Sequence, residues 1–202
     1  MEAGNTNTRK MLVLGVSAFA LMGAGFVLAV FFSSMSPSEA VLSDTKRPIK
    51  VHLGDMMIGE LIKLKWAGSP IIILRRDLSN VAKLPELNSL LSDPSSEIDP
   101  DPDYVQSGYR SIKSEYFVAY GYSTHCGCTL GFSEEVKSYM TKIDGGVFFD
   151  VCHIATYDTA GRVLAASAEP GPSELLPPRV ANLFIPPHRY IADDVILIGE
   201  EP

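Results

Sequence analysis

The chain has few of the residues that nucleic-acid binding and many catalytic mechanisms require. It contains 17 Lys and Arg against 24 Asp and Glu, a formal net charge of -7, and the basic residues are scattered. A basic surface that could neutralise phosphates is therefore missing, and nucleic acid is not an expected partner. The sequence has no glycine-rich phosphate loop, no Gly-x-Ser-x-Gly nucleophile motif and no internal repeat. With only 3 cysteines and 4 histidines, any chemistry has to come from a few positions.

Charge is absent over one long apolar segment near the N-terminus. Residues 11–32 read MLVLGVSAFALMGAGFVLAVFF, long enough to cross a hydrocarbon core of about 30 Å as a helix. A cleaved signal peptide is the alternative, but its apolar part is usually only about 7 to 15 residues long. Arg9 and Lys10 precede the segment, and positive residues tend to stay on the cytoplasmic side. The pattern predicts a membrane helix with the N-terminus in the cytoplasm and the folded domain outside it.

The rest of the chain divides into a linker and a domain with mainly β patterns. We expect a cytoplasmic tail at 1–10, the transmembrane helix at 11–32, a polar linker at 33–48 and one folded domain at 49–202. In ELIKLKW and SPIIILRR an alternating strand precedes an apolar one, which predicts a hairpin turning at Ala67-Gly68. EYFVAYGY, GGVFFDV and RYIADDVILIGE predict further strands. Residues 77–109 carry a weak helical pattern and then an acidic loop, SDPSSEIDPDPD, expected to be a solvated surface insertion.

Two short stretches gather the cysteines and two of the histidines. STHCGCTLGF runs from Ser123 to Phe132, and DVCHIATYD runs from Asp150 to Asp158; each follows a predicted strand. Closely spaced Cys and His residues are typical of metal sites. Here, however, the Cys and His residues do not make up the complete ligand set of a familiar metal site.

Together with the anchor, these stretches resemble the Rieske iron-sulfur subunit of quinol:cytochrome c oxidoreductase, the cytochrome bc complex. The resemblance runs through SSMSPSEAVLS, LKWAGSPIIILRR, GGVFFDVCHIATYDTAGR and NLFIPPHRYIADDVILIG. It implies a mainly β fold, a Rieske-type antiparallel β-sandwich with a cluster-binding-like subdomain at 123–158, behind one N-terminal transmembrane helix. It also implies an inner-membrane protein with its domain in the periplasm, or in the intermembrane space of a mitochondrion. The implied partners are the lipid membrane and the cytochrome b and cytochrome c-type subunits of the complex.

In that family the loops Cys-Thr-His-Leu-Gly-Cys and Cys-Pro-Cys-His-Gly hold a two-iron, two-sulfur cluster through the first Cys and the His of each loop. The resemblance places His125 and His153 at the imidazole positions. It places Ser123 and Asp150 at the thiolate positions. The two remaining loop cysteines match the pair that forms the family's disulfide, Cys128 and Cys152. The resemblance therefore implies that the disulfide is kept while both thiolate ligands are lost.

Neighbouring positions depart from the family pattern as well. The shielding leucine of the first loop is Cys126, and Val151, Ile154 and Ala155 replace a proline, a glycine and a serine of the second loop, whereas Tyr157 is kept. Soft thiolates hold iron-sulfur clusters, and a neutral hydroxyl and a hard carboxylate favour other ions. We therefore expect no bound cofactor, and we read Cys126 as a small apolar filler. The leading hypothesis is a structural or assembly subunit of the complex that is not itself redox-active.

Two alternatives stay open. The chain could be a working electron carrier from quinol to a c-type cytochrome, with a two-iron, two-sulfur cluster in atypical ligation. A single Fe or Zn ion could instead bind to His125, Asp150 and His153, because two histidines and one carboxylate are a known ligand set for Fe(II), and zinc accepts the same donors. His52 and His188 have no such companions in the sequence and are expected to be surface or packing residues.

Overall fold

The computed structural model of the chain describes residues 3–35, 46–106, 108–134, 143, 145–152, 155–165 and 180–202. It divides into two compact units, Met1–Asp44 and Thr45–Pro202. The first contains the helix α1 (Ala3–Met35). The described part of the second contains β1 (Ile49–His52), β2 (Leu61–Trp66), β3 (Ser69–Arg75), α3 (Leu78–Val81), the 3-10 helix η1 (Leu84–Leu90), β4 (Tyr116–Tyr120), β5 (Leu130–Ser133), β6 (Val147–Asp150), β7 (Thr156–Tyr157), β8 (His188–Ala192) and β9 (Val195–Ile198).

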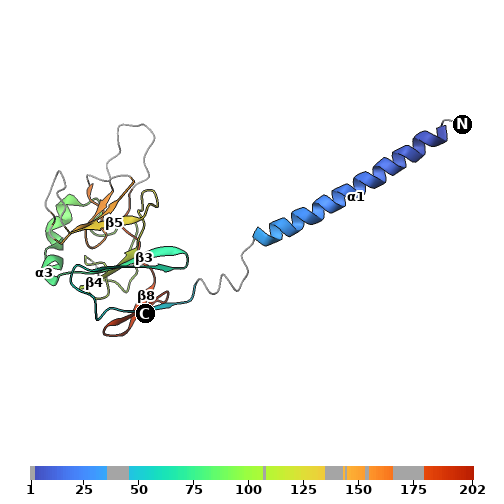
Figure 1. Ribbon diagram of the computed structural model, residues 1–202. Coiled ribbons are helices and arrows are strands. Elements are labelled where there is room, and N and C mark those ends of the chain that lie inside the picture. Colours follow the sequence, from blue (N-terminus) through green and yellow to red (C-terminus); the bar gives the residue numbers. More distant parts are fainter. Residues whose placement is uncertain are drawn as a thin grey trace. The chain divides into compact units, whose positions relative to one another are not determined.

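The helix α1 contains the whole of the predicted span 11–32 and is longer at both ends (Figure 1). Because a helix satisfies its backbone hydrogen bonds internally, polar flanking residues can continue it. Ser34, expected to lie in the linker, is in its last turn and donates from its hydroxyl to the carbonyl of Phe31 at 2.8 Å. Residues 36–45 of the predicted linker lie outside the described residues. Large apolar side chains of α1 are exposed, from 53% at Leu28 to 78% at Phe19, and α1 is the candidate membrane span among the described residues.

The domain is built on an antiparallel sheet with the order β2-β3-β4. Side chains alternate across a strand, so Ile72 and Leu74 of β3 enter one core and Ile71 and Ile73 enter another. All four are at most 2% exposed. The predicted burial of this strand on both faces is confirmed.

Each face of this sheet packs on a further three-stranded antiparallel sheet. The core around Ile72 includes residues of the sheet β5-β6-β7: Leu130, Phe148 and Tyr157. The core around Ile71 includes residues of the sheet β1-β9-β8 and its flank: Leu53, Ile196 and Ile198. The result is the mainly antiparallel β domain that the sequence predicts, and the predicted closing strand pair is present as β8 and β9 (Figure 1).

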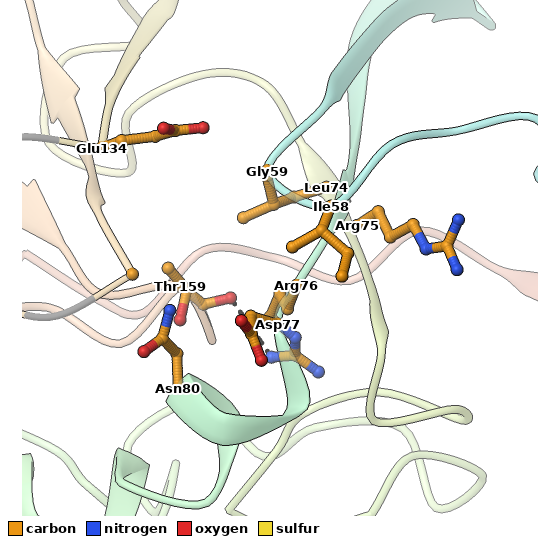
Figure 2. Close-up of a pocket in the computed structure, with 10 residues that line it drawn as sticks. Ile58, Gly59, Leu74, Arg75, Arg76, Asp77, Asn80, Glu134 and Thr159 are labelled. Carbon is orange, nitrogen blue, oxygen red and sulfur yellow. Dashed lines mark hydrogen bonds between the residues drawn. The ribbon is translucent and has the colours of Figure 1, made fainter.

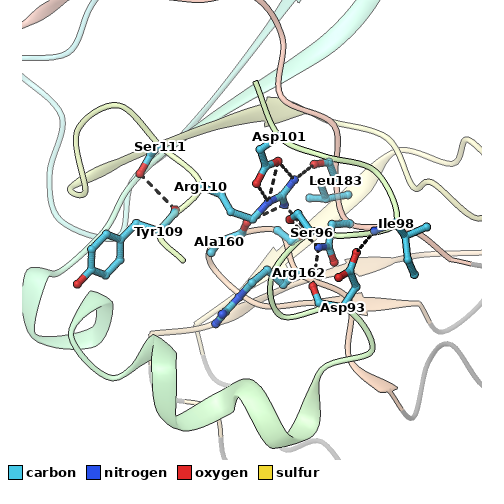
Figure 3. Close-up of polar contacts among 12 residues, drawn as sticks. Asp93, Ser96, Ile98, Asp101, Tyr109, Arg110, Ser111, Ala160, Arg162 and Leu183 are labelled. Carbon is cyan, nitrogen blue, oxygen red and sulfur yellow. Dashed lines mark hydrogen bonds and ion pairs between the residues drawn. The ribbon is translucent and has the colours of Figure 1, made fainter. Parts of the chain in front are cut away.

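The acidic loop is tied to the domain by buried polar groups. Asp93 is 6% exposed, and its carboxylate accepts two backbone N–H hydrogen bonds at 2.8 and 3.0 Å. The guanidinium of Arg110, 3% exposed, donates to the Asp101 carboxylate and to three backbone carbonyls, those of Ala160, Gly161 and Leu183 (Figure 3). Residues 97–100 are exposed, so the predicted surface insertion is present. It is also anchored, because the Asp101 carboxylate pairs with Arg110 and the side-chain amide of Asn182 donates to the carbonyl of Asp93. A local composition pattern does not reveal such pairing.

Candidate functional site

The register of β5 and β6 brings the two Cys/His stretches together. Leu130 on β5 lies opposite Asp150 on β6 in an antiparallel pair, so the same register continued by two residues places Cys128 opposite Cys152. These two cysteines form a disulfide with their Cα atoms 6.4 Å apart. The disulfide implied by the family resemblance is thus confirmed, and it joins the first stretch to the second.

The first stretch folds into a tight loop between β4 and β5. The N–H of Ser123 donates to the carbonyl of Cys128, and the N–H of Gly127 donates to the carbonyl of Ser123, both at 2.8 Å. Gly127 has a φ of 75°, in the left-handed region that glycine adopts without a steric penalty. The loop therefore closes on Ser123, which is 1% exposed.

The hydroxyl of Tyr157, on β7, holds this loop to the sheet. It lies 3.1 Å from Ser123 Oγ and 3.0 Å from Thr124 Oγ1, and it accepts from the N–H of Thr124 at 3.3 Å. The hydroxyl of Thr124 donates in turn to the carbonyl of Ala181 at 2.6 Å. Burial raises the pKa of Tyr157, so the phenol stays protonated at neutral pH. The resemblance points to Tyr157, whereas no sequence pattern points to Thr124.

Asp150 ends β6 and is 4% exposed. Its Oδ1 accepts the N–H of Cys152 at 2.7 Å, and its Oδ2 lies 2.9 Å from the Sγ of Cys126. This hydrogen bond raises the pKa of the Cys126 thiol, which is consistent with the thiol as donor. Cys126 is free and exposed. The prediction of an apolar filler is therefore wrong: a buried carboxylate needs hydrogen-bond donors, and the thiol is one of those it uses.

Of the two histidines of the candidate site, the structure describes only His125. His125 lies in the first loop, partly buried, and its backbone N–H donates to Ser123 Oγ at 3.2 Å. His153 lies outside the described residues. The four ligand positions Ser123, His125, Asp150 and His153 therefore stay predictions, and so does the alternative ion site at His125, Asp150 and His153. What the structure does bring together is a different set, with donor atoms within 4.8 Å of one another: Cys126, Cys128, Asp150 and Cys152.

A separate pocket of about 320 Å³ is lined by none of the predicted site residues (Figure 2). Arg76 borders it, and its guanidinium donates to three backbone carbonyls and one hydroxyl, those of Tyr109, Ser114, Thr159 and Ser111. Burial lowers the pKa of Arg76 to about 10, so the side chain remains charged at neutral pH. Asp77, also at the pocket, caps α3 by accepting from the N–H of Ser79 at 2.8 Å. Both charged residues serve the fold.

Comparisons with known proteins place the chain in a family. No family model matches the chain. The ubiquinol-cytochrome c reductase iron-sulfur subunit of Allochromatium vinosum is 35% identical over 198 residues, which cover 98% of this chain and 90% of that protein. The subunit of the same name from Rickettsia typhi is 31% identical and covers 96% of this chain and 94% of that protein. The subunit of the same name from Bradyrhizobium diazoefficiens is 31% identical and covers 98% of this chain and 97% of that protein.

Among solved structures, a chain of a hyperthermophilic respiratory complex III matches with a TM-score of 0.40 and 20% identity, over 91% of this chain and 97% of that chain. That level of similarity does not by itself establish a shared fold. The curated relatives do establish kinship, because their identity extends along nearly the whole sequence. The chain belongs to the family of ubiquinol-cytochrome c reductase iron-sulfur subunits, the Rieske family.

Proposed function

We propose that this protein is a membrane-anchored Rieske-family subunit that binds no iron-sulfur cluster and has a structural or assembly role in a ubiquinol-cytochrome c reductase complex. One observation carries the proposal. The two positions that match thiolate ligands hold oxygen donors, Ser123 and Asp150, and both are engaged by other groups of the domain. Without the cluster, the parts available for function are the folded domain, its disulfide and the anchor.

A two-iron, two-sulfur cluster does not fit these donors. A Rieske centre has two thiolates on one iron and two imidazoles on the other, so Ser123 and Asp150 would remove both protein ligands of the same iron. A serine hydroxyl is a weak neutral donor, and a carboxylate is a hard one, whereas the cluster requires soft sulfur. Asp150 is buried and paired with Cys126 and the Cys152 N–H. A cluster in contact with it would compete with both hydrogen bonds, at a cost that burial increases.

Membership of a complex does not require a redox centre. The exposed apolar side chains of α1 suit a lipid environment. Arg9 and Lys10 would keep the N-terminus in the cytoplasm, which leaves the domain in the periplasm or the intermembrane space. The Cys128–Cys152 disulfide agrees with such an oxidising compartment. The expected partners are lipid and the cytochrome b and cytochrome c-type subunits of the complex.

Purification of the full-length protein from native membranes through a C-terminal tag tests this role. We expect b- and c-type cytochromes to be recovered with it, and a variant lacking residues 11–32 to be soluble and to recover neither. A matched control replaces residues 11–32 by a leucine-alanine helix of equal length. This variant stays in the membrane, so a loss of cytochromes from it would show that the partners recognise the native helix. Recovery of the intact protein without cytochromes would contradict the proposal.

A further inference from the structure

The donors around the disulfide form a compact group of atoms that could bind a metal ion. The Sγ atoms of Cys126, Cys128 and Cys152 and a carboxylate oxygen of Asp150 lie within 4.8 Å of one another. In the structure Cys126 is a free thiol, and the other two cysteines are bonded to each other. We propose that reduction of the Cys128–Cys152 disulfide converts this group into a binding site for one Zn²⁺ ion, held by three thiolates and the Asp150 carboxylate.

The distances suit a tetrahedral zinc site. With Zn–S bonds of about 2.3 Å and Zn–O bonds of about 2.0 to 2.2 Å, the donors of such a site lie roughly 3.5 to 3.8 Å apart. The Sγ of Cys126 and the Oδ2 of Asp150 are 2.9 Å apart, so these two need to separate only slightly. Once the Cys128–Cys152 disulfide is broken, the two sulfurs can move apart by rotation of the cysteine side chains. Next to the two cysteines, the β5–β6 strands are joined by backbone pairing from Leu130 opposite Asp150 to Ser133 opposite Val147.

The ligand chemistry favours zinc over the harder cations. Three thiolates with one carboxylate are a donor set for Zn²⁺, whereas Mg²⁺ and Ca²⁺ take oxygen ligands. The hydrogen bond between Cys126 and Asp150 is the protonated form of two of these ligands, and an ion would replace its proton. Cys126 and Cys152 are exposed, so both a reductant and an ion can reach the group from solvent.

The reaction balances with a dithiol as reductant. The dithiol supplies two electrons and two protons, the S–S bond between Cys128 and Cys152 breaks, and the dithiol is converted to its own disulfide. Binding of Zn²⁺ then releases the protons of the three thiols. Reoxidation would expel the ion, so occupancy of the site reports the redox state of the disulfide.

Cobalt(II) is a direct probe because its thiolate bonds absorb light. We expect the full-length protein in detergent, reduced anaerobically with a phosphine, to bind one Co²⁺ with a near-ultraviolet thiolate charge-transfer band and tetrahedral visible bands. Zn²⁺ should displace the Co²⁺ and protect all three cysteines from alkylation. The disulfide-bonded protein should show neither band. In Cys126→Ser the charge-transfer intensity should fall to about two thirds, because two thiolates remain; Asp150→Asn should keep the band and bind more weakly.

Three results would overturn the proposal. One is that Co²⁺ binds equally to the oxidised and reduced proteins, or binds without a charge-transfer band. Either outcome would point to histidine and carboxylate ligands. Another is a Cys126→Ser variant with the full band and unchanged affinity. If reduction alone unfolds the domain, Zn²⁺ must restore its circular dichroism spectrum, and failure to do so contradicts the site. The proposed function is judged separately, by the iron and sulfide content of the oxidised protein.

Discussion

Among single side chains, Tyr157 makes the contacts that hold the first loop to strand β7. Tyr157→Phe keeps the buried ring and removes the hydroxyl, so Ser123 and Thr124 lose a partner in a place that excludes water. We expect the free energy of unfolding to fall by about 1 to 3 kcal/mol, as measured by urea denaturation. The control is Tyr122→Phe, on a partly exposed ring, which should change it by less than about 0.5 kcal/mol. Equal effects of the two variants would argue against this role for the hydroxyl.

The two oxygen donors at the thiolate positions can be replaced one at a time. Ser123→Cys alone and Asp150→Cys alone each leave one iron of a Rieske centre with a single thiolate. After reconstitution with iron and sulfide, we expect both single variants to remain colourless and the double variant to bind cluster in part. Visible absorption and EPR spectra measure the outcome. A coloured, EPR-active single variant would show that one thiolate is enough.

We expect His188 to make the stability of the domain depend on pH. It is 1% exposed, its Nδ1 lies 2.8 Å from the carbonyl of Pro186, and burial lowers its pKa. The unfolded chain therefore binds the proton more readily than the folded one. The contribution of His188 is fully present above about pH 6.5, the ordinary value for histidine, and is lost as the pH falls toward the lowered pKa of the folded state.

Urea denaturation at a series of pH values below about 6.5 measures this dependence. We expect His188→Phe to unfold more easily at neutral pH, because it loses the hydrogen bond, but to lose less stability on acidification than the native protein. His52→Gln, at an exposed position, is the control and should keep the native slope. An unchanged slope in His188→Phe would exclude His188 as its source.

Among strands and turns, the β2–β3 connection is the clearest case of a local signal that predicts structure. Ala67 and Gly68 have φ values of 49° and 83°, as a two-residue hairpin turn with both central residues left-handed requires. A Cβ at Gly68 would meet nothing within 4 Å, so Gly68→Ala should cost only the conformational penalty, about 1 to 2 kcal/mol of unfolding free energy. Ala67→Asn should add about 0.5 to 1 kcal/mol, since asparagine tolerates this conformation. Thermal unfolding checks both signs, and a stabilising Gly68→Ala would contradict the turn.

The alternating and apolar patterns were sufficient to predict the strands, because the order of polar and apolar residues along a strand reflects whether one or both of its faces are buried. They predict β3 and the closing pair β8 and β9, as observed. The hydrogen bond between Cys126 and Asp150 has no such local signal, since it depends on how β5 pairs with β6. The partnership of Asp101 with Arg110 is missed for the same reason. Contacts that cross from one strand or loop to another need the register, which composition does not contain.

For the whole chain, the disulfide followed from the family resemblance, and the structure adds why it can form there. Continuation of the Leu130–Asp150 pairing places Cys128 opposite Cys152. The same geometry positions Asp150 beside Cys126 and Ser123 near Tyr157. A Rieske-family domain can thus keep its disulfide and its layered core with hydrogen-bonded oxygen groups at the positions matching the thiolate ligands.

The iron and acid-labile sulfide content of the native full-length protein, purified anaerobically from its own membranes, decides whether the redox centre is absent. Because Ser123 and Asp150 would leave one iron without protein thiolates, we predict iron and sulfide far below stoichiometric amounts and no EPR signal in the dithionite-reduced protein. Near-stoichiometric iron and sulfide, with the low average g value of a histidine-ligated two-iron centre, would contradict the proposal and identify the protein as an electron carrier.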